Sequence, residues 1–192
     1  MKKLNLLILI FWFGSVSNAV FCANLEKGVA AAQAGNYAAA LIELRPLAEA
    51  GDHMAQMILG FMYQRGHGVP KDFKISAKWM ELSAKQENGT AQYELARLYH
   101  FGVGVNQNYK KAIRYYAMSA LNGHLDAIFE YAMFLRKGEY IKKDLKLAGG
   151  MLKDAAKLGH MNSQYAIGHF FYDGMGVIQD FEESIYWYKK AA

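Results

Sequence analysis

The sequence predicts an all-helical solenoid of stacked antiparallel helix pairs, and three observations carry this prediction. The same residue types return every 36 positions along most of the 192-residue chain, which is the signature of a repeat architecture. Apolar residues such as Leu59, Met62 and Tyr63 recur at helical spacing within a period. Only Pro46 and Pro70 interrupt the chain, so helices can form almost everywhere.

The ends of the helices account for two of the repeating positions. Glycines that can end the first helix of each unit, helix A, stand 36 residues apart: Gly66, Gly102, Gly138 and Gly174. Side chains that can cap the start of the second helix, helix B, have the same spacing: Asp72, Asn108, Asp144 and Asp180. Glycine accepts the left-handed conformation of a helix end, and Asp or Asn accepts hydrogen bonds from the first free amides.

Other repeating positions describe packing. Helix A is expected to begin near Ala55, Ala91, Ala127 or Ser163. A small residue is kept on it so that helix B can approach closely, at Gly60, Ala96, Ala132 and Gly168. A large residue on helix B is expected to fill the space between helices, at Trp79, Tyr115, Met151 and Trp187.

The register divides the chain into units. Residues 52–87, 88–123, 124–159 and 160–192 form four repeats, and residues 24–51 form a leading helical hairpin. We therefore expect ten helices and no sheet. Terminal units of a solenoid need a cap, and the sequence stops at Ala192 on an apolar stretch of helix B. The last helix is then partly bare or the sequence is a fragment of a longer array, and we favour the fragment.

Residues 1–19 have the features of a signal peptide. Two lysines precede an apolar stretch from Leu4 to Phe13, and small residues precede a cleavage point after Ala19, with residue 23 as an alternative. A third interpretation of this segment is a lipid anchor on Cys22. The apolar stretch is about half of the ~20 residues that span a bilayer, so we expect a periplasmic or secreted protein with no transmembrane helix.

Charge and metal-ligand content exclude several classes of function. The net charge of +5, reduced by loss of the two leading lysines, is too small and scattered for a nucleic-acid partner. The single cysteine rules out an internal disulfide. His124 and His160 lie one repeat apart, farther than zinc ligands allow, and are interpreted as surface turn residues. No metal or cofactor is expected.

The string Ala-x-x-x-Leu-Gly-x-x-Tyr-x-x-Gly-x-Gly-Val-x-x-Asp, from Ala55 to Asp72, resembles the Sel-1-like repeat, a relative of the tetratricopeptide repeat. The resemblance covers residues 52–192 and implies a right-handed solenoid that acts as an adaptor or scaffold. It also implies that helix A lines a concave binding surface. Exported bacterial members are associated with envelope maintenance, polysaccharide production or host contact. The third unit departs from the pattern, because Tyr140 replaces the second loop glycine.

The resemblance to tetratricopeptide grooves also implies which residues meet a partner. They follow the spacing i, i+4, i+7 on helix A and are called the helix A stripe: Met57, Phe61, Tyr93, Arg97, His100, Phe129, Met133, Arg136, Tyr165, His169 and Tyr172. Aromatic, Met and Arg side chains are enriched in binding hot spots. A protein or extended peptide is therefore the expected partner.

Two alternatives remain beside this non-enzymatic scaffold. Aromatic rings and histidines also stack on sugars, so a carbohydrate-binding envelope protein with a polysaccharide partner is the second hypothesis. The third and remote one is a glycan hydrolase. Glu94 and Glu130 occupy equivalent positions on successive A helices, and the carboxyl groups of inverting glycosidases lie ~6.5–9.5 Å apart.

Overall fold

The computed structural model describes residues 24–192. These residues fall into two compact units, one ending at Ser83 and the other running from Ala84 to Ala192. The predicted signal peptide and Cys22 lie outside the described residues. Residues 24–192 are all-helical, with no strand among them, and none of their helices is long and apolar enough to cross a membrane.

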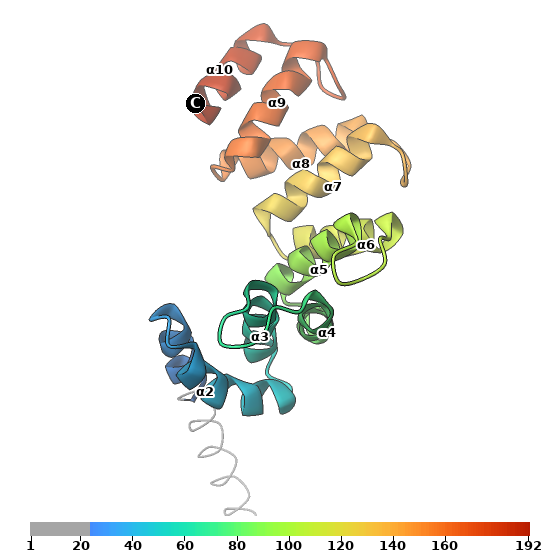
Figure 1. Cartoon of the computed structure of the whole chain (residues 1–192). Coiled ribbons are helices and arrows are strands. Elements are labelled where there is room, and N and C mark those ends of the chain that lie inside the picture. Colours follow the sequence, from blue (N-terminus) through green and yellow to red (C-terminus); the bar gives the residue numbers. More distant parts are fainter. Residues whose placement is uncertain (1–23) are drawn as a thin grey trace, which may run out of the picture. The chain divides into compact units, whose positions relative to one another are not determined.

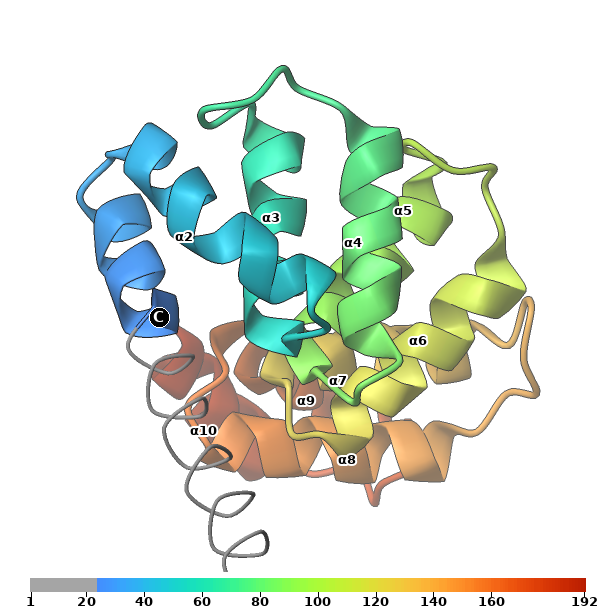
Figure 2. The same cartoon turned by 90° about the horizontal axis from the view of Figure 1, so that it is seen from below.

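The first unit consists of short helices joined by tight turns. A helical stretch over 24–33 is followed by α2 (Tyr37–Glu49), α3 (His53–Arg65) and α4 (Phe73–Ala84), whose last residue begins the second unit. Helices α2 and α3 pack together, as both views show (Figures 1 and 2). Ser83 Oγ donates a 2.7 Å hydrogen bond to the carbonyl of His53 and so ties α4 to α3.

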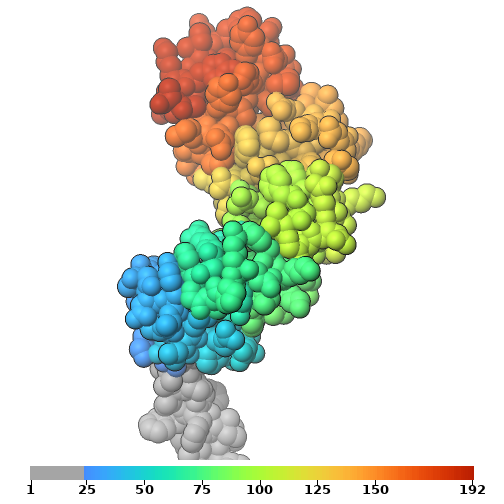
Figure 3. Space-filling view, viewed as in Figure 1, coloured from blue at the N-terminus to red at the C-terminus, as the bar shows by residue number. Residues whose placement is uncertain are grey.

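The second unit contains three helix pairs, in which each helix packs on its chain neighbours. The helices are α5 (Gly89–Phe101), α6 (Tyr109–Leu121), α7 (Leu125–Lys137), α8 (Leu145–Lys157), α9 (Met161–Asp173) and α10 (Phe181–Ala191). The A helices are α3, α5, α7 and α9, and the B helices are α4, α6, α8 and α10. Side chains fill the spaces between the ribbons within each unit (Figure 3).

The predicted helix ends are confirmed. The glycine that follows each A helix has a φ between 68° and 75° and donates its amide hydrogen to the last turn. Each predicted B-helix cap accepts from the first turn through its side-chain oxygen, as Asp144 Oδ1 does from the amide of Leu147 at 2.9 Å. Both ends are therefore determined by residues within a few positions in the sequence.

The A helices begin two residues earlier than predicted, at His53, Gly89, Leu125 and Met161. Their caps are Asp52, Asn88, His124 and His160, each accepting a hydrogen bond from the amide three residues on. The interpretation of the two histidines as surface turn residues is thus corrected: both are helix caps and are partly buried. The interpretation failed because histidine is an unusual residue at a helix start.

The close approach at the small position of helix A is confirmed where glycine occupies it. A Cβ on Gly60 would lie 2.9 Å from Met80 Cε, and one on Gly168 would lie 2.8 Å from the ring of Tyr188. Ala96 and Ala132 are fully buried at the equivalent positions. Helix B therefore lies directly against this part of helix A.

The large residue that fills the core is one position later than predicted in three repeats. Met80, Tyr116 and Leu152 are at most 1% exposed, whereas Trp79, Tyr115 and Met151 are only half-buried. Trp187 is buried as expected, at 5% exposure. One residue turns a helix by about 100°, so the sequence pattern located the buried face of helix B without fixing its centre.

Candidate functional site

The helix A stripe lines a pocket in the first unit. Met57 and Phe61 contribute to a largely apolar pocket of about 480 Å³, whose wall is completed by α2 and by residues of the 24–33 helix. Arg65 lies 5.6 Å from the centroid of the Phe61 ring. Tyr37 and His67 stack at 4.2 Å beside it. This region offers apolar contact with one peripheral cation.

A second pocket lies between α7 and α9 and is called the arginine pocket. It has a volume of about 280 Å³, and its lining comes from these two A helices alone: Phe129, Met133, Arg136, Asn162, Tyr165, Ala166 and His169. Five of these residues belong to the predicted stripe. Tyr188 of α10 supports the pocket, because its ring lies 5.5 Å from Tyr165 and 5.3 Å from His169. The approach of Tyr188 depends on the absent side chain of Gly168.

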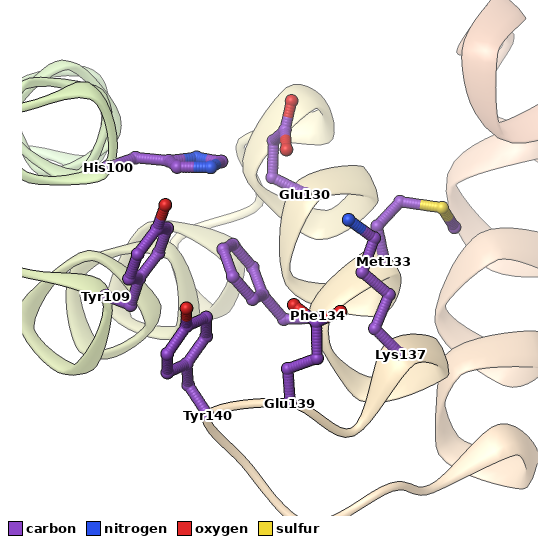
Figure 4. Close-up of a pocket in the computed structure, with 8 residues that line it drawn as sticks. All are labelled: His100, Tyr109, Glu130, Met133, Phe134, Lys137, Glu139 and Tyr140. Atoms are coloured by element: carbon purple, nitrogen blue, oxygen red, sulfur yellow. The ribbon is translucent and has the colours of Figure 1, made fainter.

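A third pocket, called the tyrosine pocket, lies between α5, α6 and α7 and the loop after α7 (Figure 4). It has a volume of about 150 Å³ and is lined by His100, Tyr109, Glu130, Met133, Phe134, Lys137, Glu139 and Tyr140. In Figure 4, His100, Tyr109 and Tyr140 face the side chains that α7 contributes. Met133 lines both this pocket and the arginine pocket.

Loop glycines at two equivalent positions lie against the start of an earlier helix, α2 or α8. A Cβ on Gly68 would lie 2.8 Å from Tyr37 Cβ, and one on Gly176 would lie 2.3 Å from the backbone of Leu145. Both glycines have positive φ, near 70°. In both cases the loop backbone packs on the first residue of a helix that begins 31 positions earlier, and a side chain would separate the two.

The third repeat has a side chain at this position. Tyr140 replaces the glycine, and its ring stacks on Tyr109, the residue 31 positions earlier, with centroids 4.2 Å apart. Tyr140 does not have positive φ. Gln107 Nε2 donates a 3.0 Å hydrogen bond to Tyr109 Oη. The backbone contact of the other loops is thus replaced by a ring pair that forms one wall of the tyrosine pocket.

Burial changes the acid–base behaviour of two residues in the tyrosine pocket. Desolvation raises the pKa of the half-buried Glu130, an effect that Arg97 opposes. Desolvation and the nearby Lys137 lower the pKa of His100. His100 Nδ1 lies 3.2 Å from Tyr116 Oη, whose own pKa is raised by burial. Burial therefore favours the neutral form of the His100 ring.

Three stripe residues of the second unit lie outside the arginine pocket and the tyrosine pocket. Tyr93 packs on His124 with centroids 4.5 Å apart, and burial raises its pKa to about 12. Arg97 donates to the Glu94 carboxylate at 3.4 Å. Tyr172 is 53% exposed and contacts Phe181 edge-on. The structure thus separates the stripe into different environments.

The two glutamates of the hydrolase hypothesis also have different surroundings. Glu130 lines the tyrosine pocket, and Glu94 does not. Glu94 is 9% exposed and pairs with Arg97 on its own helix. Within residues 24–192, no three His, Cys, Asp or Glu side chains are grouped as metal ligands would be.

Several lining residues were not predicted from the sequence. Tyr109, Lys137, Glu139 and Asn162 lie outside the i, i+4, i+7 spacing. The sequence distinguishes Tyr140 only as a departure from the loop pattern. An apolar pocket of about 400 Å³ on α6, α7 and α8, which includes Leu121, Leu147 and Met151, was also missed. Its residues have the ordinary spacing of a packed helix face.

Comparison with known proteins agrees with the repeat register. The family model described as Sel1 repeat matches residues 53–88, 89–124, 125–160 and 162–192. No curated protein matches the chain at a significant level.

Two solved structures share the fold. A Sel1 repeat protein from Oxalobacter formigenes is 26% identical, with a TM-score of 0.82, over 87% of this chain and 69% of that one. The protective antigen c5321, described as present in uropathogenic Escherichia coli strains and displaying an SLR fold, is 25% identical, with a TM-score of 0.84, over 95% of this chain and 40% of that one. With four matched repeats and this solenoid fold, the chain belongs to the Sel1 repeat family.

Proposed function

We propose that this chain is a non-enzymatic scaffold that binds a protein or extended peptide through the arginine pocket and the neighbouring stripe residues. Sel1 repeat proteins are generally protein-interaction scaffolds. The observation that carries the proposal is the convergence of Phe129, Met133 and Arg136 with Tyr165 and His169 on one cavity. Aromatic and Arg side chains around a pocket are the usual anchors of binding energy.

The chemistry of the arginine pocket favours an acidic group of the partner. Arg136 is half-buried and can give a carboxylate two parallel hydrogen bonds. Phe129 and Tyr165 supply apolar surface beside it. Rings beside such a pair exclude water, and the lower local dielectric strengthens the attraction between the guanidinium and the carboxylate.

We propose that the scaffold acts in the bacterial envelope or outside the cell. The support is the signal-peptide pattern of residues 1–19. N-terminal sequencing of protein from the periplasm or medium should give a chain beginning at Val20, or at Asn24 if cleavage occurs later. A stable membrane form that keeps Met1 would contradict this location.

Photo-cross-linking in living cells tests the binding site. A benzophenone amino acid replaces Tyr165, which is 56% exposed, or Tyr186, which is 49% exposed on α10 and serves as the control. We expect a discrete protein adduct at position 165 that Arg136→Gln reduces. Equal adducts at both positions, or adducts only from a variant labelled at Leu147, would refute the arginine pocket as the site.

The carbohydrate alternative has one supporting observation, the exposed rings of Tyr165 and Tyr172 at 56% and 53% exposure. Sugars stack on such faces. The same cross-linking experiment separates the alternatives, because an adduct with polysaccharide loses mass on glycosidase digestion. An adduct with a protein keeps its mass under the same glycosidase digestion.

A further inference from the structure

The arginine pocket and the tyrosine pocket lie on either side of one residue. Met133 lines both, while its neighbours on α7 divide between them. Phe129 and Arg136 line the arginine pocket, and Glu130 and Lys137 line the tyrosine pocket. A chain that crosses α7 above Met133 would therefore reach both pockets.

The pockets have opposite formal charge. The tyrosine pocket has two carboxylates, Glu130 and Glu139, and one ammonium group, Lys137. The arginine pocket has the guanidinium of Arg136 and no acidic side chain in its lining. An anionic group is thus favoured in the arginine pocket and opposed in the tyrosine pocket by a net negative charge.

Aromatic rings also line the tyrosine pocket, from Tyr109, Phe134 and Tyr140. His100 lies 5.2 Å from Phe134 and 5.6 Å from Tyr109, measured between ring centroids. Tyr109 in turn stacks on Tyr140. Aromatic faces attract organic cations within about 6 Å of the centroid. A neutral His100 ring does not repel such a cation, and burial lowers the pKa of this histidine.

Other ligand classes fit the tyrosine pocket less well. A carboxylate or phosphate would face Glu130 and Glu139. A wholly apolar group would desolvate the Glu130 carboxylate further and give it no new hydrogen bond, which costs free energy. His100, Glu130 and Glu139 are not grouped as metal ligands would be, since no such group of three is found in residues 24–192. An organic cation satisfies both the rings and the carboxylates.

We propose that the tyrosine pocket binds the ammonium or guanidinium group of a Lys or Arg side chain on the same partner whose acidic group occupies the arginine pocket. This inference rests on the proposed peptide-binding function. Packed helices lie ~8–10 Å apart and an extended peptide advances about 3.3 Å per residue. The partner therefore presents a basic and an acidic side chain about three residues apart.

The first test uses small probes and the methionine methyl groups as NMR reporters. Butylguanidinium should shift the Met133 methyl resonance saturably and leave that of Met151, on α8, unchanged. Glu130→Gln should weaken this binding about fivefold, and so should Tyr140→Ala, which removes one ring. Arg136→Gln should leave it unchanged. Butyrate should show the reverse dependence on Glu130→Gln and Arg136→Gln.

Glu182→Gln, on the exposed first turn of α10, is the matched control for Glu130→Gln. Since glutamine has the shape of glutamate, Glu130→Gln keeps the packing, and unchanged methyl spectra of the free variant verify its fold. The proposal is overturned if butylguanidinium fails to shift Met133 in the parent protein. It is also overturned if the shift is indifferent to both Glu130→Gln and Tyr140→Ala.

The second test uses capped peptides with one Asp and one Lys separated by one to five positions in a Ser/Ala background. The tightest binding is expected at a separation of about three, weakened by Glu130→Gln and by Arg136→Gln. If the peptides bind no better than butylguanidinium, the ligand is a free cation and the paired-pocket proposal is overturned. Binding of butyrate without any cation binding would overturn this inference alone. Absence of adducts at position 165 would instead refute the proposed function.

Discussion

The rings of Tyr109 and Tyr140 stack with centroids 4.2 Å apart and planes inclined by only 8°. In two other repeats the corresponding contact is made by a loop glycine against the first residue of an earlier helix, as between Gly176 and Leu145. The third repeat thus keeps the contact while changing its chemistry. The substitution that departs from the repeat pattern is also the one that forms a wall of the tyrosine pocket.

This ring pair should contribute measurably to stability. Tyr109→Ala and Tyr140→Ala should show a coupling of about 0.5–1.5 kcal/mol in a double-mutant cycle, because aromatic pairs stabilise beyond the area they bury. Free energies of unfolding from urea titrations provide the measurement. A coupling near zero would mean that the rings lie together without holding the loop.

The glycine at the small position of α9 should be needed for close packing. Gly168→Ala should destabilise the protein by about 1–3 kcal/mol through overpacking, because the new Cβ would lie 2.8 Å from the rigid Tyr188 ring. Gly150→Ala is the control, since this helical glycine has nothing within 4 Å of its Cβ position. That change should stabilise α8 by about 0.5–1 kcal/mol. Equal effects of the two changes would contradict the close crossing.

Glu87 should be a site of backbone strain. It has a φ of 63°, and the residues at the equivalent position of the other units, Gly51, Gly123 and Gly159, also have positive φ. A left-handed conformation costs a residue with a side chain roughly 1–2 kcal/mol. Glu87→Gly should therefore stabilise the protein by about 0.5–1 kcal/mol after the entropy cost of glycine.

The reverse substitution provides the control for Glu87. Gly123→Ala places a side chain at a φ of 78° without steric contact, so it should cost about 1 kcal/mol through backbone strain alone. Thermal and urea unfolding of both variants provide the measurement. If Glu87→Gly lowers stability, other interactions of Glu87 outweigh its strain.

The fold could be predicted to the extent that short-range chemistry determines it. A glycine that ends a helix and an Asp or Asn that caps one contact only residues a few positions away. Their return every 36 residues therefore makes the helix ends recognisable in the sequence. The rotation of helix B depends on the neighbouring helices, and Met80 rather than Trp79 is fully buried for that reason. His124 was misread because its capping role depends on which ring nitrogen faces the amide of Ala127.

The candidate site was predictable only where it follows one helix. The i, i+4, i+7 spacing selects Phe129, Met133 and Arg136, which line one cavity. Tyr109 and Tyr140 come from the start of α6 and from a loop, and only the packing of two repeats brings them together. Arg97 follows the spacing, yet it pairs with Glu94, one turn away.

His124 should make stability depend on pH. Burial lowers its pKa below the ordinary value of 6.5, so the unfolded chain takes up a proton more readily than the folded one. The stabilisation is complete above pH 6.5 and is lost as the pH falls towards the folded pKa. His124→Asn, which provides the cap found at Asn88, should reduce the loss of stability between pH 7 and the acid range. Identical pH profiles of the two proteins would show that His124 is not the group responsible. The pH dependence of stability that remains in His124→Asn is assigned in part to His100, whose pKa is also lowered.

Arg136 and Arg97 should differ in their importance for binding, although the stripe includes both. Arg136 lines the arginine pocket, whereas Arg97 is held over Tyr93 and against Glu94. Arg136→Gln should reduce the free energy of binding to the cross-linked partner by about 1–2 kcal/mol, as expected of a hot spot. Arg97→Gln should have a smaller effect on binding. Titration calorimetry with the purified partner measures both, and Arg114→Gln on α6 is the matched control. The free energies of unfolding of all three variants should lie within about 0.5 kcal/mol of the parent value, as is usual for surface substitutions. A larger binding loss for Arg97→Gln than for Arg136→Gln would move the binding site to α5.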